Sequence, residues 1–241
     1  MPISYSVGGE WLHHLIVAYK READPSVPDA AAQLAYVLDS FLSLHERCAA
    51  QAVGLERFTL VTTVPSSDWF RDQWHPLRSV VGRLTPATAD RYARLLVSTP
   101  PEDHPLRARP ASDQRPASRR FDPGRYTATC RLNGESVLLI DDMWTTGASA
   151  QSAAAALRAA GAGQVVAVVI GRHLNRGWDQ NNARLRQLAA GGFSFARCVR
   201  CRDGLGLSVG DRLRQVRGSH PSCTHAVTVQ THARSDHPQR F

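Results

Sequence analysis

The segment Val137–Ser149 reads VLLIDDMWTTGAS, and this stretch decides the fold class. In residues 136–140, Ser136 is followed by four consecutive apolar residues, and this run predicts a buried strand. Residues 141–147 predict a tight polar turn, residues 148–160 an alanine-rich helix, and residues 165–170 a second apolar strand. This strand–turn–helix–strand order implies parallel strands, joined by a right-handed crossover and covered by helices on both faces. The sequence therefore predicts an α/β fold.

Earlier parts of the chain supply further elements of the same fold. Apolar residues at helical spacing in residues 11–19 predict a short amphipathic helix. Asp29 can cap a long helix over residues 30–52. The short β-branched run at 58–64 predicts a buried strand, and residues 75–84 are expected to be helical.

Arginine carries nearly all of the positive charge. The net charge is +8, and Lys20 is the sole lysine among 241 residues. Such charge favours polyanions, although a coding bias toward arginine would give the same composition. Residues 99–131 alternate prolines with arginines and cannot hold a helix. They are expected to form either an arm that closes over an anion or a solvated linker.

Length and hydropathy favour one principal domain. Residues 1–192 are assigned to it, and residues 193–241 to a C-terminal appendage that is expected to be partly disordered. No stretch reaches the roughly 18 consecutive apolar residues that a membrane span needs. Residues 1–10 do not resemble a signal peptide, so the cytoplasm is the expected location.

Two carboxylates and a hydroxyl-rich turn make the predicted strand end a candidate ligand site. Asp141 and Asp142 can accept hydrogen bonds from a vicinal diol such as the 2- and 3-hydroxyls of a ribose, and they can position Mg²⁺. The helix N-terminus that follows suits a phosphate dianion, and a glycine there lets the backbone approach closely. The expected phosphate-binding residues are Thr145, Thr146, Gly147, Ala148 and Ser149.

This segment resembles the phosphoribosyl pyrophosphate motif of type I phosphoribosyltransferases. That motif has four apolar residues, two acids, two variable residues, a hydroxyl pair, a glycine and a terminal hydroxyl. The turn has neither the lysine of a Walker loop nor the GxGxxG spacing of a dinucleotide fold. The resemblance implies a type I phosphoribosyltransferase-like fold, with Asp141 and Asp142 as the central catalytic pair and Mg²⁺ as cofactor.

The resemblance extends to the ComF-type, competence-associated branch of that family, over residues 11–175. It rests on LIVAYK at residues 15–20, on VTTVPSS at 61–67 and on the arginine-rich loop before the motif. It implies that Ser66, Ser67 and Arg71 bind pyrophosphate. One of three loop arginines is expected to join them: Arg115, Arg119 or Arg120.

Three departures from the family pattern matter. Hypoxanthine-guanine enzymes carry an aspartate where this chain has Thr145, which argues against that substrate class. Trp144 occupies a usually aliphatic position, where its ring could lie near the ligand or pack on the following helix, and we expect packing. ComF-type members generally begin with a four-cysteine zinc module that this sequence lacks.

A cysteine and histidine set near the C-terminus predicts a tetrahedral zinc site. Its expected ligands are Cys198, Cys201, Cys223 and His225. Cys48 and Cys130 are interpreted as small core residues, and His45 as a core or surface residue. Five cysteines in a chain without an export signal disfavour a disulfide framework.

Two functions follow from these observations, and a third, a nucleic-acid-binding protein with zinc, is disfavoured because little aromatic interleaving accompanies the basic stretches. The first is a glycosyltransferase that transfers the phosphoribosyl group of phosphoribosyl pyrophosphate to a nitrogen acceptor, which the sequence does not identify. The alternative is a non-catalytic regulator that binds the same ligand and associates with nucleic acid through its arginines. The sequence leaves two further partners possible: nucleic acid, and a second copy of the chain in a homodimer. No membrane partner is expected. Turnover with an acceptor would separate the two functions.

Overall fold

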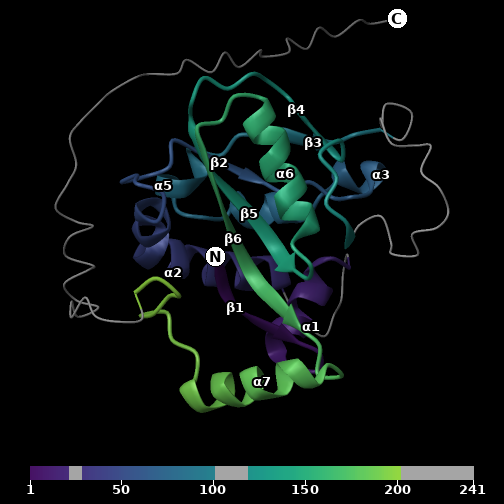
Figure 1. The fold of residues 1–241 in the computed structure, drawn as a ribbon, viewed down its shortest axis with the longest axis vertical. Helices are drawn as coiled ribbons and strands as arrows, with labels where there is room; N and C mark the ends of the chain where they lie inside the picture. The colour runs from purple at the N-terminus through teal and green to yellow at the C-terminus, as the bar shows by residue number, and fades with distance from the viewer. Residues whose placement is uncertain (22–28, 101–118, 202–241) are drawn as a thin grey trace, which may run out of the picture. The chain divides into compact units, whose positions relative to one another are not determined.

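The computed structural model describes residues 1–21, 29–100 and 119–201 (Figure 1). These residues belong to one compact unit, Met1–Leu205, and the second unit, Gly206–Phe241, lies outside the described residues. Residues 193–201 thus belong to the compact unit, although the expected domain boundary was 192. Among the described helices, none is long and apolar enough to cross a membrane.

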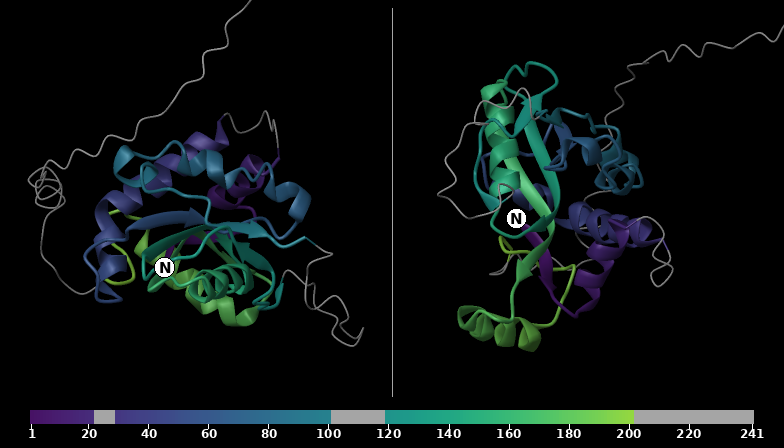
Figure 2. Two further views of the ribbon diagram at one scale, coloured as in Figure 1. Left: turned by 90° about the horizontal axis from the view of Figure 1, so that it is seen from above. Right: turned by 90° about the vertical axis from the view of Figure 1, so that its right-hand side faces the viewer.

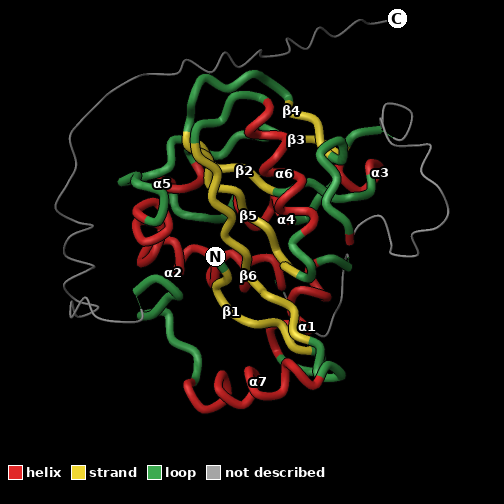
Figure 3. The backbone as a smooth tube through the Cα atoms, viewed as in Figure 1, coloured by secondary structure: helices red, strands yellow, loops and turns green. Residues whose placement is uncertain are grey.

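A parallel sheet forms the centre of the unit and confirms the predicted α/β class. Its four strands are hydrogen-bonded in the order β1-β6-β5-β2, and all three neighbouring pairs are parallel (Figure 3). A two-stranded antiparallel sheet pairs β3 with β4. The strands are β1 (Pro2–Val7), β2 (Leu60–Thr63), β3 (Leu96–Ser98), β4 (Tyr126–Ala128), β5 (Ser136–Trp144) and β6 (Gln164–Leu174).

Helices flank both faces of the parallel sheet, and the two views in Figure 2 separate α1 and α2 from α6. The predicted early helices are present, and the Asp29 carboxylate caps α2 by accepting from the Ala32 N–H at 3.2 Å. The helix expected at residues 75–84 is shorter in the structure, where only Leu77–Val81 forms α4. The helices are α1 (Trp11–Tyr19), α2 (Ala30–Gln51), α3 (Trp69–Asp72), α4 (Leu77–Val81), α5 (Pro86–Ala89), α6 (Ala148–Ala159) and α7 (Asp179–Gly191).

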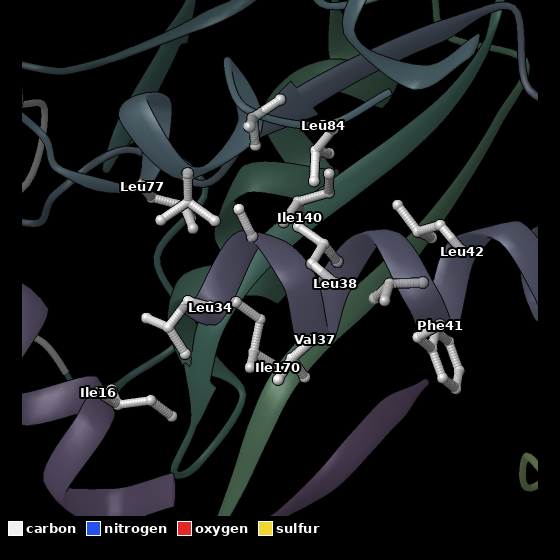
Figure 4. Packing of buried hydrophobic residues seen from close by; sticks show 14 of the residues in the cluster. Ile16, Leu34, Val37, Leu38, Phe41, Leu42, Leu77, Leu84, Ile140 and Ile170 are labelled. Carbon is white, nitrogen blue, oxygen red and sulfur yellow. The ribbon is translucent and has the colours of Figure 1, made fainter. Parts of the chain in front are cut away.

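Strand β5 divides the core into two clusters because successive side chains point to opposite faces. Leu138 and Ile140 pack with α1, α2 and α4, and Figure 4 shows Ile140 beside the apolar face of α2. Val137 and Leu139 pack with α6, β3 and β4. All four side chains are fully buried, so β5 is fixed from both faces. Its carboxyl end is therefore a rigid place from which to present functional groups.

The strands at the centre are longer than the sequence predicts. Asp141 and Asp142 lie inside β5, not in the expected turn, and only residues 145–147 form the turn. The extension follows from pairing: β6 continues to Leu174 because β1 pairs with its second half, and β5 pairs alongside as far as Trp144↔Arg172. Residues 2–7, which form β1, alternate apolar and polar side chains from Ile3 to Val7, but this local pattern does not show that the segment pairs with β6, so the pairing was missed.

Candidate functional site

Strand β5 ends in a turn whose backbone only glycine fits. Gly147 has a φ of +81°, in the left-handed region. A Cβ added there would collide with the Trp144 ring, which packs against the turn and the core cluster on the α6 face. The Trp144 ring therefore packs against the turn and the core, in agreement with the packing role expected for it.

The turn borders a cavity of about 210 Å³ at the N-terminus of α6. The cavity is lined by Arg119, Asp141, Met143 and the consecutive residues 145–149. The Thr145 and Thr146 side chains are exposed, whereas Gly147 and Ala148 are buried. Helix-terminal N–H groups, hydroxyls and a guanidinium together make this cavity suited to an anion.

The end of the arginine-rich loop lies over this turn. The Thr146 hydroxyl donates to the Arg119 carbonyl oxygen at 3.3 Å, and a guanidinium N–H of Arg125 donates to the Ser149 hydroxyl at 3.3 Å. Of the three loop arginines considered from sequence, Arg119 lines the cavity, and the Arg120 carbonyl accepts from Arg125 at 2.5 Å. Arg115 lies outside the described residues. Arg125, which is buried, was not anticipated.

Asp141 and Asp142 are both buried at the end of β5. The Asp141 carboxylate accepts from the Asp142 N–H at 2.9 Å. One oxygen of Asp142 accepts from the Lys20 ammonium at 2.8 Å, and the other accepts from the Tyr19 hydroxyl. Asp141 thus faces the cavity, while Asp142 ties β5 to the end of α1.

Burial dominates the electrostatics of this pair. It raises the pKa of Asp141 to about 6, against the opposing effect of Lys20, and it raises the pKa of Asp142 to about 7. Burial also lowers the pKa of Lys20, and the charge of Arg71 adds to that effect. Asp142 already accepts from an ammonium and a hydroxyl, and both donors favour its ionised form against the effect of burial. A cation or a set of hydroxyl donors in the cavity would favour the ionised form of Asp141 in the same way.

Tyr19 and Lys20 are site residues to which sequence reasoning gave no role of their own. They lie more than a hundred positions from Asp142 and reach it only because α1 follows β1, whose pairing with β6 was not predicted. The LIVAYK pattern at residues 15–20 was the available signal, since it ends with this tyrosine and lysine.

The loop after β2 leaves the sheet at the same edge as the β5 turn, because Thr63 pairs with Ile140 in parallel register. Ser66 is half-buried, and Ser67 and Arg71 are exposed. The Ser66 N–H donates to the Asp72 carboxylate at 3.1 Å. These three expected pyrophosphate ligands therefore share the sheet edge with Asp141, but none of them lines the cavity beside Arg119.

Two titratable side chains, Asp72 and His75, lie next to this loop. Asp72 is buried and also accepts from an Arg94 N–H at 2.9 Å and the Ser98 N–H at 3.2 Å. The Nδ1 atom of His75 is buried and has no hydrogen-bond partner among the described residues. Burial lowers the pKa of His75 to about 4 against the opposing charge of Asp72, and the charges of Lys20, Arg78 and Arg94 also lower it. Both an acidic and several basic side chains thus act on the groups beside the loop after β2.

A second cluster of functional side chains lies on α2. His45 and Cys48 meet Cys198 and Cys201, and one potential ligand atom from each lies within 4.8 Å of the other three. Such a set could hold a metal ion such as zinc. It contains two of the four expected ligands; Cys223 and His225 lie outside the described residues. The prediction that Cys130 is a core residue is wrong, because Cys130 lies after the short strand β4 and is exposed.

Comparison with known proteins gives little beyond the geometry. No protein-family model matches the chain, and no curated protein matches it. A solved structure, described as the allosteric regulatory enzyme of purine biosynthesis, is 21% identical to the chain, with a TM-score of 0.27. The match covers 55% of this chain and 26% of that one, about a quarter of its length. A TM-score this low supports no statement about the site, so function must be argued from the residues of the chain itself.

Proposed function

We propose that this chain is a type I phosphoribosyltransferase-like protein of the ComF type that binds phosphoribosyl pyrophosphate at the carboxyl end of β5. The observation that carries the proposal is the position of a buried carboxyl pair directly beside an anion-suited turn at a helix N-terminus. Phosphate at residues 145–149 would accept from backbone N–H groups and from the Ser149 hydroxyl, and the Thr146 hydroxyl would turn to it from the Arg119 carbonyl. The ribose hydroxyls would then donate to Asp141, which lines the cavity, and Asp142 would join it by exchanging its bond to Tyr19 or Lys20.

Magnesium fits the donor chemistry of this site. Mg²⁺ prefers carboxylate oxygens and keeps several of its waters, and it usually binds together with substrate phosphates. Asp141, whose carboxylate lines the cavity, is the first residue that would hold it, with Asp142 beside it. When bound, Mg²⁺ supplies positive charge to the pyrophosphate. The raised pKa values of both carboxyls mean that binding it would release protons near neutral pH.

For transfer, the bond between C1 of the ribose and the pyrophosphate oxygen breaks, and its electron pair leaves with pyrophosphate. A nitrogen lone pair of the acceptor forms the new bond to C1, and the nitrogen then loses a proton. Preorganised positive charge stabilises the leaving group. The loop with Ser66, Ser67 and Arg71 leaves the sheet at the same edge as Asp141 and carries the Arg71 guanidinium, which supports its assignment as the pyrophosphate site.

One observation favours the non-catalytic alternative. Thr145 lines the cavity, and its hydroxyl cannot replace the aspartate that hypoxanthine-guanine enzymes use near the base. A regulator would keep the phosphate and ribose contacts without turning over. Release of pyrophosphate in the presence of candidate nitrogen acceptors tests this directly: release with any acceptor supports transfer, and binding without release supports the regulator.

The proposal is tested by thermal unfolding with phosphoribosyl pyrophosphate and Mg²⁺. Ligand at about a hundred times its Kd adds roughly 2.7 kcal/mol, or about 5–10 °C in Tm for a protein of this size. We expect this shift in the native chain and in Asp90→Asn, which changes an exposed aspartate outside the cavity. The Asp141→Asn/Asp142→Asn variant should show no ligand-induced shift. Equal shifts in all three proteins, or none in the native chain, would overturn the assignment.

A further inference from the structure

The cysteine and histidine cluster joins two distant parts of the chain. His45 and Cys48 are three residues apart on α2, so they share one face of the helix. Cys198 and Cys201 belong to the segment that follows α7. His45 is fully buried, Cys198 is 6% exposed, and Cys48 and Cys201 pack against the same core cluster. The four side chains therefore converge at the edge of the core.

Their spacing matches a tetrahedral ion site. Zn–S bonds of about 2.3 Å and Zn–N bonds of about 2.0–2.1 Å place tetrahedral ligands about 3.8 Å apart for two sulfurs and about 3.6 Å for sulfur and nitrogen. Here the His45 Nδ1 atom lies 3.8 Å from the Cys48 sulfur and 3.5 Å from the Cys201 sulfur. The two sulfurs of Cys198 and Cys201 are 3.2 Å apart. An ion would need only small side-chain adjustments to sit among them.

The surroundings prepare three of the four groups, His45, Cys198 and Cys201, to act as ligands. The Nε2 atom of His45 lies 2.7 Å from the Phe195 carbonyl oxygen. Because that oxygen can only accept, Nε2 carries the proton and Nδ1 offers its lone pair to the three sulfurs, as in metal sites where the second ring nitrogen donates to a carbonyl. Backbone N–H groups of Cys198 and Arg200 donate to the sulfurs of Cys201 and Cys198, at 3.3 and 3.4 Å. Such bonds stabilise thiolates.

A disulfide explains the arrangement less well. It needs a sulfur–sulfur distance of about 2.05 Å and would use only two of the three cysteines. A metal ion uses all four groups at once.

We propose that His45, Cys48, Cys198 and Cys201 bind one Zn²⁺ ion in a closed, structural site. All four tetrahedral positions are filled by protein, so the ion takes no part in the chemistry at β5. It fastens the segment after α7 to α2, where Phe195 and Cys198 also contact the core. This set departs from the ligands expected from sequence, because His45 and Cys48 take the places expected for Cys223 and His225. The inference does not depend on the proposed ligand of the cavity.

The test is the metal content of the full chain, measured by mass spectrometry after purification without added chelator. We expect about one zinc per chain in the native protein, as tetrahedral sites of this kind bind tightly. Cys48→Ser should lose the zinc. The matched controls Cys130→Ser, which changes an exposed thiol outside the cluster, and Cys223→Ser should keep it. Retention in Cys48→Ser with loss in Cys223→Ser would overturn the proposed ligand set, as would a folded native chain without metal.

Cobalt keeps the proposal testable if Cys48→Ser does not fold. Co²⁺ exchanged into the native chain should give the visible bands of a tetrahedral site and charge-transfer bands from thiolate. His45→Cys replaces the nitrogen with a fourth sulfur. It should keep the metal and strengthen the charge-transfer absorption relative to the native chain. Octahedral cobalt spectra, or identical spectra for the native chain and His45→Cys, would contradict the assignment.

Discussion

Replacing Asp141 with asparagine should stabilise the protein at alkaline pH while removing its ligand site. The pKa of Asp141 is raised from 3.8 in the unfolded chain to about 6 in the folded one. Its contribution to stability is therefore fully present below about pH 4 and is lost as the pH rises through about 6. At 1.36 kcal/mol per pKa unit, the ionised carboxylate costs about 3 kcal/mol at pH 8. The asparagine side chain carries no charge, and its amide oxygen can still accept from the Asp142 N–H.

The assay is thermal unfolding of both proteins at pH 8 and near pH 4.5. We expect Asp141→Asn to gain about 1–3 kcal/mol at pH 8, or roughly 3–10 °C in Tm, and to gain little at the acidic pH. Asp90→Asn, which also removes one negative charge, should change stability by less than about 0.5 kcal/mol. A loss of stability at pH 8, or a gain of equal size at both pH values, would refute the claim that burial destabilises this carboxylate.

Three further predictions concern the residues around the site. Gly147→Ala should lower the free energy of unfolding by about 2–4 kcal/mol in urea titrations. Gly54→Ala, with a similar φ of +76° and open space around it, should lose only about 1–2 kcal/mol, so equal losses would show that the Trp144 ring does not restrict position 147. His75, whose pKa is lowered to about 4, should stay neutral above about pH 5, and its contribution to stability should be lost as the pH falls from about 6.5 toward 4. Proton NMR would contradict this if the His75 ring titrates near 6.5. Arg119→Ala should weaken phosphoribosyl pyrophosphate about 10–100-fold in calorimetry, as loss of a charged hydrogen bond does, and an unchanged Kd would exclude Arg119 from the site.

Much of the fold could be predicted because its signals are local. The apolar run before Asp141 and the helix after Gly147 are visible in one stretch of sequence, and Asp29 marks the start of α2. β1 was missed although Ile3, Tyr5 and Val7 alternate with polar residues, because so short a pattern does not show that the segment pairs with β6. The same pairing lengthens β5 and converts an expected turn into strand.

The candidate site likewise contains residues that local signals predict and residues that they do not. Residues 145–149 were predicted because one continuous segment builds the turn. Lys20 and Arg125 reach the site from other elements, by contacts that no local pattern encodes. His45 looked like an ordinary core residue because Cys198 and Cys201 lie about 150 positions away along the chain, although Cys48 lies three positions away on α2. Only the folded chain brings them together.

The central claim is that residues 145–149 hold the phosphate of phosphoribosyl pyrophosphate. The most direct measurement is a crystal structure of the native chain grown with that ligand and Mg²⁺. We expect the 5-phosphate at the backbone N–H groups of residues 145–149 and the ribose hydroxyls within hydrogen-bonding distance of Asp141 or Asp142. Ligand bound elsewhere on the molecule, or an unchanged cavity at saturating ligand, would contradict the account.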